Sequence, residues 1–289
     1  MAGLLNHFKD HLNLVRVKQW YKNLVVFLPI FFVGHLLIGN ELYLTFLGFL
    51  SLSLVSSVNY IINDIIDLKA DRLHPEKKSR PLATNKISRT WAIILSFLLL
   101  IISFTLSWSL GVFFFYSVIG LFILSQLYSF FFKNIIFVDI LTIAVLFVIR
   151  AVSGAYIINV KISPWLILCP FFLSLFLSIG KRHSDLNLLK ENAFLTRKVL
   201  KDYNSELTSS LMTISTTLLI ISYALYSFLS DHQNLIYTLP FALFVIFRYF
   251  YLINSKSIIA RHPEKIIKDK NMIIGIILWI LVTALSIYF

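Results

Sequence analysis

Long apolar runs recur from one end of this chain to the other. Each covers roughly 17–25 residues, the length at which a helix crosses the hydrocarbon core of a bilayer. The pattern predicts an all-α, polytopic membrane protein with about nine transmembrane helices in one bundle, so that residues 1–289 form a single transmembrane domain. The predicted spans are about 23–39, 44–63, 91–108, 110–128, 137–157, 164–180, 208–229, 234–253 and 271–289.

Composition and charge agree with this interpretation. Hydrophobic residues make up 58% of the chain and charged residues only 14%, against roughly 25% charged in soluble domains. A net charge of +12 could suggest nucleic acid, but all of the 26 Lys and Arg except Arg150, Lys161 and Arg248 fall in segments between alternate spans. These segments are 1–22, 67–90, Lys133, 181–207 and 254–270.

The positive-inside rule places these basic segments, and with them the N-terminus, in the cytoplasm. We therefore expect a multi-pass protein of the inner (plasma) membrane with the lipid bilayer as a partner and no nucleic-acid partner. The N-terminal segment 1–22 has apolar residues at helical spacing, which predicts an amphipathic helix at the membrane interface.

Three aspartates lie where the second predicted span ends, in the stretch "NDIIDLKAD". On a continuous helix Asp64, Asp67 and Asp71 share one face, with Asn63 beside them. Like charges so close repel, and a divalent cation removes the conflict. Mg²⁺ prefers oxygen ligands and binds through a few carboxylates together with substrate phosphates. The pattern favours a Mg²⁺ site (Mn²⁺ being a second possible metal) over the alternative of a solvated helix end, since cations that could bind phosphate follow at once.

The stretch at 63–71 resembles the first Asp-rich motif, NDxxDxxxD, of the UbiA superfamily of intramembrane prenyltransferases, and "RPLATNKIS" resembles the run that follows it there. The resemblance implies a bundle of nine helices whose active site opens to the cytoplasm. The active-site loops would then be 64–90 and 181–207.

The second loop points to one branch of that superfamily. Most members carry a second Asp-rich motif here, but this chain reads "SIGKRHSDLNLLKEN", with Lys181, Arg182 and Asp185. Together with "QWYKN" near the N-terminus, it resembles the polyprenyl-phosphate (decaprenyl-phosphate) phosphoribosyltransferase branch over nearly the whole chain. Val17, where Pro is expected, and Asp185, where Glu is usual, depart from that pattern. The resemblance implies transfer of 5-phosphoribose from phosphoribosyl pyrophosphate to a long-chain polyprenyl phosphate, with release of pyrophosphate.

This implied reaction assigns roles to the polar residues. Asp64 and Asp67, with Asp71, would hold the metal on the pyrophosphate, and Lys181 and Arg182 would act as catalytic cations, since arginine binds phosphate in a bidentate way. The candidate substrate-binding residues are Lys22, Asn23, Asn63, Arg72, Arg80, Tyr128, Lys133, Asp139, Arg150, Asp185 and Arg248. Arg150 and Arg248 lie inside spans, where a cation costs at least about 2.5–3.5 kcal/mol and needs a substrate or a buried partner.

Two other functions remain open at this point. An aromatic prenyltransferase would keep the fold and use a prenyl diphosphate donor, although the "GKRHSD" loop argues against it. A transporter would more often show Gly- and Pro-broken spans and inverted halves, and the sequence shows neither clearly.

Overall fold

A computed structural model describes residues 2–73, 77–189, 197–255, 257–261 and 263–289. Within these ranges every regular element is an α- or 3₁₀-helix, in agreement with the predicted all-α class. The elements are α1 (Ala2–Val15), η1 (Val17–Phe27), α2 (Leu28–Phe32), α3 (Gly39–Ile66), α4 (Leu68–Leu73), η2 (Lys77–Ser79), α5 (Arg89–Ser109), α6 (Val112–Phe130), η3 (Phe132–Asn134), α7 (Val138–Ile157), α8 (Pro164–Leu189), η5 (Lys198–Lys201), α10 (Ser205–Leu229), η6 (Gln233–Thr238), α11 (Leu239–Asn254), α12 (Ile258–Arg261), η7 (Pro263–Lys268) and α13 (Lys270–Tyr288).

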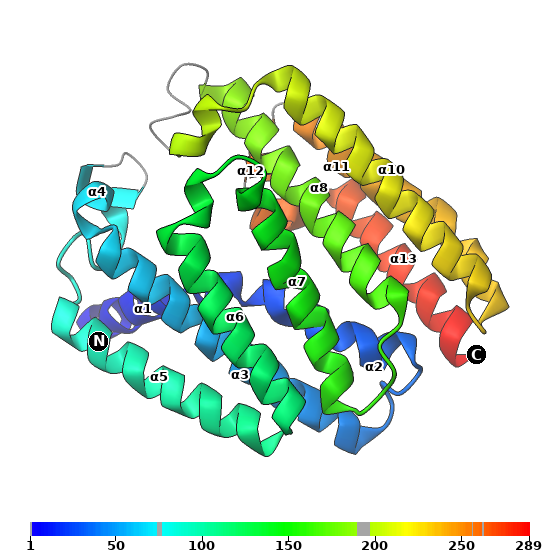
Figure 1. The fold of residues 1–289 in the computed structure, drawn as a ribbon, viewed down its shortest axis with the longest axis horizontal. Coiled ribbons are helices and arrows are strands. Elements are labelled where there is room, and N and C mark those ends of the chain that lie inside the picture. The colour runs from blue at the N-terminus through cyan, green and yellow to red at the C-terminus, as the bar shows by residue number, and fades with distance from the viewer. Residues whose placement is uncertain (1, 74–76, 190–196, 256, 262) are drawn as a thin grey trace.

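Eight helices in the described part of the chain are long and apolar enough to cross a membrane. They are α3, α5, α6, α7, α8, α10, α11 together with η6 from Asn234 on, and α13, and they match the last eight predicted spans. They pack side by side as one bundle (Figure 1). We call the end of the bundle that carries Asp64, Asp67 and Asp71 the aspartate end.

The prediction of a first transmembrane helix over 23–39 is wrong. The chain instead crosses the bundle as η1 followed by the short α2. A 3₁₀-helix rises about 2.0 Å per residue, so η1 and α2 together extend roughly 30 Å, the thickness of the hydrocarbon core. Arg16, just before η1, contacts Asp64 at the aspartate end, and Leu36, just after α2, donates its N–H to the hydroxyl of Tyr288 (3.2 Å) at the opposite end.

Local packing explains this unusual crossing. Pro29 lies in the first turn of α2, where its missing N–H is tolerated, and it cannot continue a ladder begun in η1. Gly154 of α7 lets η1 approach closely, because a Cβ there would lie 2.0 Å from the carbonyl oxygen of Val26. The crossing therefore starts some six residues earlier than predicted, and it places Lys22 and Asn23 within the bundle rather than at its boundary.

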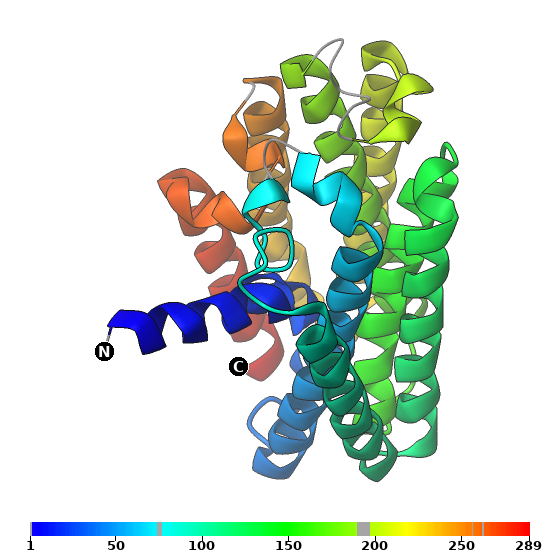
Figure 2. The same cartoon turned by 90° about the vertical axis from the view of Figure 1, so that its left-hand side faces the viewer.

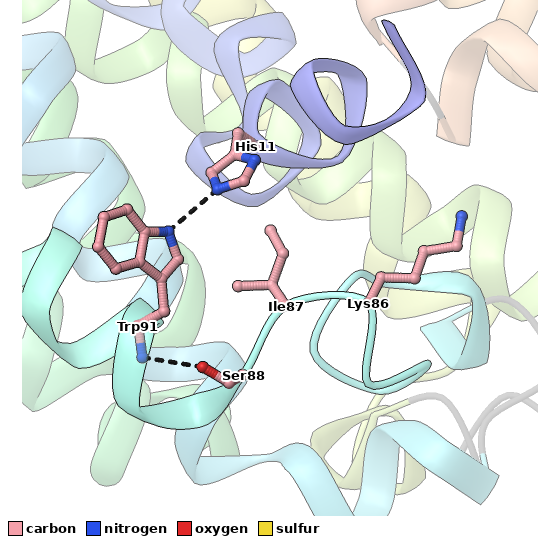
Figure 3. Close-up of a pocket in the computed structure, with 5 residues that line it drawn as sticks. All are labelled: His11, Lys86, Ile87, Ser88 and Trp91. Carbon is pink, nitrogen blue, oxygen red and sulfur yellow. Dashed lines mark hydrogen bonds between the residues drawn. The ribbon is translucent and has the colours of Figure 1, made fainter. Parts of the chain in front are cut away.

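Helix α1 lies outside this bundle and runs sideways from it (Figure 2). Fully buried Leu14 anchors its C-terminal end, whereas Phe8 and Leu12 are exposed. The Trp91 indole N–H of α5 donates to Nε2 of His11 (3.0 Å), and both side chains line a pocket (Figure 3). Phe8 and Leu12 lie four residues apart on α1, so their exposed side chains share one face of the helix. Residues 17–22 of the predicted interfacial segment belong instead to the crossing, and the interfacial position of α1 stays a prediction.

Candidate active site

The three aspartates do not share one uninterrupted helix, as the spacing had predicted. α3 ends at Ile66, and Asp67 follows as its C-cap with its N–H donating to the carbonyl oxygen of Asn63 (2.9 Å). Asp64 and Asp71 are each only 2% exposed, whereas the Asp67 side chain keeps 26% exposure. The turn between α3 and α4 therefore buries two carboxylates and leaves the third facing outward.

A single arginine joins the two buried carboxylates. Arg80 Nη1 donates to Asp64 Oδ1 (2.9 Å) and to Asp71 Oδ2 (2.5 Å). Arg16, from the start of the crossing segment, also donates to Asp64, and Lys77 Nζ lies 4.0 Å from Asp71 Oδ1. Burial lowers the pKa of Lys77 below its ordinary value, and the positive charge of Arg80 lowers that pKa further.

The segment that carries Arg80 is fixed by its own turn and by two apolar anchors. The N–H of Thr84 donates to the carbonyl oxygen of Arg80 (3.0 Å), and the N–H of Ile87 donates to that of Pro81 (3.3 Å). Leu82 and Ile87 are buried against α3 and α5. The "RPLATNKIS" run thus buries apolar residues at both ends of a turn, which holds Arg80 against the aspartates.

The remaining predicted residues of this loop have other partners. Asp67 lies beside Lys133 of η3, whose Nζ is 3.2 Å from its Oδ2. Exposed Arg72 donates to Asn85 Oδ1 (2.7 Å), so it faces the loop instead of the carboxylates. Residues 74–76 of the predicted 64–90 loop lie outside the described residues.

The predicted cluster of three metal-binding carboxylates is therefore not assembled. Among the residues that the structure describes, no three His, Cys, Asp or Glu side chains converge as metal ligands. The physical reason is that cations of the chain itself bind each carboxylate. Asp64 and Asp71 still fit a divalent cation by their chemistry, because one positively charged nitrogen of Arg80 reaches an oxygen of each.

A second buried cluster surrounds Asp139, in the first turn of α7. This fully buried carboxylate accepts from Arg182 Nε (3.0 Å) and from the Tyr203 hydroxyl (2.8 Å), and Arg197 Nη1 lies 3.6 Å away. Arg197 also donates from Nη2 to the Tyr128 hydroxyl (2.9 Å). Predicted Arg182, Asp139 and Tyr128 are thus brought together, with two arginines around one carboxylate.

Tyr203 is held as a hydrogen-bond donor in this second cluster. Burial, and next the negative charge of Asp139, raise the pKa of Tyr203 above its ordinary value. Its oxygen also accepts the backbone N–H of Phe137 (3.0 Å). The phenol therefore stays protonated across the physiological pH range and keeps donating to Asp139.

Tyr128 connects the two clusters. Its hydroxyl accepts from Arg197 of the second cluster, and it lies in the last turn of α6, five residues before Lys133. Because Lys133 binds Asp67, Tyr128 lies between the aspartates of α3 and α4 and the arginines around Asp139. Both clusters thus belong to one polar region at the aspartate end.

The "GKRHSDL" run separates its cations by helical geometry. Lys181 is exposed while Arg182 is only 2% exposed, since successive residues of a helix point in directions about 100° apart. Asp185 is buried and accepts from Arg261 Nε of α12 (2.7 Å). The loop at 254–270 therefore contributes a cation to this region, and residues 190–196 lie outside the described ones.

The two intramembrane arginines differ in their partners. Arg248 donates to both carboxylate oxygens of Asp269 (3.2 and 2.8 Å), and this hydrogen bond holds the pKa of Asp269 below its ordinary value. That pair joins α11 to the start of α13, so the structure does not bring Arg248 to either carboxylate cluster. Buried Arg150 instead donates from Nε to Oδ1 of buried Asn23 (2.8 Å).

Sequence reasoning missed several residues of these clusters. In the sequence Arg16, Arg197 and Arg261 are three cations among many in the basic segments, and nothing in its neighbourhood distinguishes Tyr203. Each of the four meets its carboxylate 48 to 76 positions away along the chain. Contacts of this kind leave no local spacing signal in one sequence.

Comparison with known protein families gives a match over most of the chain. The profile of the UbiA prenyltransferase family matches residues 25–264. The chain belongs to this family. A UbiA homologue from Archaeoglobus fulgidus, solved bound to GPP and Mg²⁺, has the same fold with a TM-score of 0.73 at 20% identity, over 97% of this chain and 100% of that one.

Similar curated relatives of this UbiA-family chain carry a more specific name. Decaprenyl-phosphate phosphoribosyltransferase of Mycolicibacterium smegmatis is 31% identical, over 95% of this chain and 91% of the relative. The protein of that name from Mycobacterium tuberculosis is 26% identical, over 95% of this chain and 93% of the relative. The similarity therefore extends along nearly the whole length of both chains.

Proposed function

We propose that this UbiA-family protein transfers 5-phosphoribose from phosphoribosyl pyrophosphate to a long-chain polyprenyl phosphate and releases pyrophosphate. The observation that carries the proposal is the second cluster, in which Arg182 and Arg197 surround Asp139, the one carboxylate that the described residues contribute to it. Two guanidinium groups suit a substrate with a further phosphate, because arginine matches phosphate oxygens in a bidentate way. The names of the full-length curated relatives support the same reaction.

The aspartates of α3 and α4 would hold Mg²⁺, or Mn²⁺, on the donor's pyrophosphate. When bound, the metal would neutralise charge that grows on the departing pyrophosphate. Asp64 and Asp71 would supply the buried oxygens and Asp67 the more exposed one, while Arg80 and Lys77 would contact the pyrophosphate instead of the carboxylates.

The residues of the second cluster would hold the donor at its other end. Arg182 and Arg197 would bind the 5-phosphate, and Tyr128, whose hydroxyl accepts from Arg197, lies beside them. An oxygen of the lipid phosphate would then form the new bond to the anomeric carbon as the bond to pyrophosphate breaks. This acceptor is anionic at neutral pH, so the reaction requires no strong general base.

We further propose that the aspartate end faces the cytoplasm of a plasma (inner) membrane. The basic segments at 67–90 and 181–207 lie at this end, and the positive-inside rule favours the cytoplasm for them. The donor is a highly charged water-soluble molecule, so an active site at this end would receive it directly from solution.

The test is a transfer assay on the purified protein in detergent. Radiolabelled phosphoribosyl pyrophosphate, polyprenyl phosphate and Mg²⁺ should together move label into the organic phase, and omission of any one, or addition of a chelator, should abolish it. A second, matched assay uses labelled prenyl diphosphate with an aromatic acceptor. Transfer in that second assay alone would favour aromatic prenyl transfer and overturn the proposal.

A further inference from the structure

We propose that the bundle contains a buried anion site formed by Lys22, Asn59, Tyr60 and Arg150, and that this site binds the phosphate of the lipid acceptor. The assignment to the acceptor rests on the proposed function. The site itself is inferred from cations and a hydrogen-bond donor that have no anionic partners among the described residues of the bundle.

Arg150 supplies the first cation. Its side chain lies within α7, 7% exposed, with Nε bonded to Asn23 Oδ1 and Nη1 to the carbonyl oxygen of Leu146 (both 2.8 Å). These acceptors are neutral, and no carboxylate of the described residues pairs with this arginine. A buried charge without a counter-charge is unfavourable within a membrane, so the position favours an anionic ligand.

Lys22 and Tyr60 extend the positive region toward the aspartates. Lys22 directly precedes Asn23, whose Oδ1 accepts from Arg150 Nε (2.8 Å) and from the hydroxyl of Ser56 (3.4 Å), and Ser56 lies one helical turn before Tyr60 on α3. Lys22 likewise has no carboxylate partner among the described residues. Two cations therefore lie around Asn23, close to Tyr60, and neither of them pairs with a carboxylate of the described residues.

An orphaned amide donor adds a second, independent observation. Asn59 is 7% exposed and precedes Tyr60 on α3. Its Oδ1 accepts from Gln126 of α6, but its buried Nδ2 has no hydrogen-bond partner among the described residues. A buried N–H without an acceptor is costly, and a phosphate oxygen would satisfy it.

The depth of this site matches the acceptor better than the donor. Tyr60 lies four residues, or about 6 Å along α3, further into the membrane than Asp64. A water-soluble donor reaches the aspartates from the solvent side. The phosphate of a lipid embedded in the bilayer approaches from the membrane side, which is where Lys22 and Arg150 lie.

Other cations of the bundle interior do have carboxylate partners. Arg16 and Arg80 pair with Asp64, Arg182 pairs with Asp139, and Arg248 pairs with Asp269. These guanidinium groups are already neutralised by carboxylates. Lys22 and Arg150 differ from them in having only neutral partners within the described residues.

The experiment separates the two substrates by their Michaelis constants. Arg150→Gln keeps a group that can donate to Asn23, and Lys22→Gln removes the second charge. Each variant should raise the KM for polyprenyl phosphate at least about tenfold, the effect of one lost charge-assisted hydrogen bond. The KM for phosphoribosyl pyrophosphate should stay within about twofold. Lys161→Gln, an exposed lysine at the opposite end, is the matched control and should change neither.

A rise in the donor KM instead would overturn the assignment by placing the 5-phosphate at this site. Unchanged KM values in both variants would overturn the site itself. If Arg150→Gln fails to fold, Lys22→Gln decides, because its side chain is only partly buried.

Thermal unfolding with the lipid ligand tests the anion site without any requirement for turnover. Without donor, polyprenyl phosphate should raise the Tm of the wild-type protein more than polyprenol does, and this difference should vanish in Lys22→Gln. Inorganic phosphate at matched concentration tests whether the headgroup alone suffices. A phosphate-dependent shift in a protein that transfers no label would refute the proposed reaction while supporting the anion site; no difference between the two lipids would refute the site.

Discussion

Replacing Asp139 by Asn should destabilise the bundle strongly, because it removes the only carboxylate described in the second cluster. Asp139 is fully buried, and the Arg182 side chain beside it is 3% exposed. The introduced amide could still accept from the Tyr203 hydroxyl, but the Arg182 charge would be left buried without a counter-charge. Removal of one partner from such a pair typically costs about 3–5 kcal/mol.

The converse change should cost less, since the structure is asymmetric. In Arg182→Gln the carboxylate of Asp139 keeps the Tyr203 hydroxyl at 2.8 Å and Arg197 at 3.6 Å, and the Arg197 side chain is 28% exposed, with room to move closer. The double variant leaves neither a buried carboxylate nor a buried guanidinium in contact. It should therefore be more stable than the sum of the single changes implies, by roughly 2 kcal/mol or more.

Thermal unfolding of the purified protein in one detergent measures all four members of this cycle. For a chain of this size, about 3–5 kcal/mol corresponds to a fall in apparent Tm of roughly 6–20 °C for Asp139→Asn. Lys161→Gln, exposed at the opposite end, should leave Tm unchanged. Additive effects in the double variant, or a larger loss from Arg182→Gln than from Asp139→Asn, would refute the reasoning that these two side chains form the principal ion pair.

The aspartate end and the packing of η1 give three more expected outcomes. Asp64→Asn should lower the rate of label transfer by at least about 10²-fold, as expected if a metal-bound carboxylate is lost. Its Tm should fall less than that of Asp139→Asn, because Arg80 keeps Asp71 as a partner and the Arg16 side chain is 22% exposed. Full activity at saturating Mg²⁺ would contradict this role. Because burial lowers the pKa of Lys77, its charge should be lost earlier as pH rises, so the alkaline limb of kcat/KM should move to higher pH in Lys77→Arg; an unmoved limb would show that this charge is not needed. Gly154→Ala should cost about 1–3 kcal/mol, since the new methyl would lie 2.0 Å from a backbone oxygen of η1. Gly120→Ala, which has open space inside α6, should not lower the stability in the same unfolding assay and could raise it by up to about 1 kcal/mol.

The transmembrane bundle could be predicted from the sequence because a helix that crosses lipid must be apolar over most of its length. Eight of the nine predicted spans correspond to helices, since apolar length alone determines them. The first crossing could not be predicted from hydropathy, because η1 is stabilised by its contact with Gly154, 128 positions from Val26. This one difference moves Lys22 and Asn23 from the expected boundary into the bundle.

At the site, too, local residue spacing predicted some features, whereas others depend on contacts between residues far apart in the chain. The spacing of Asp64, Asp67 and Asp71 pointed to a carboxylate cluster, but the helix break after Ile66 and the partners Arg16 and Arg80 depend on contacts that no local spacing reports. Residue type remained informative at the second loop, where arginine in place of carboxylate pointed to a phosphate.

The buried cations of the bundle fall into two groups, those paired with carboxylates and those with only neutral partners. In a membrane interior each buried ion needs a counter-ion, a substrate or a route to water. The arginines of both carboxylate clusters have counter-ions in the free protein. When the donor binds, its phosphates would replace the carboxylates as partners of the same arginines. Arg150 and Lys22 have no such counter-ion among the described residues, so the acceptor phosphate would complete their charge balance and not compete with an existing ion pair. An acceptor that breaks no ion pair should have a lower Kd than a donor that must displace carboxylates, so at equal free concentrations the acceptor should raise Tm more than the donor does.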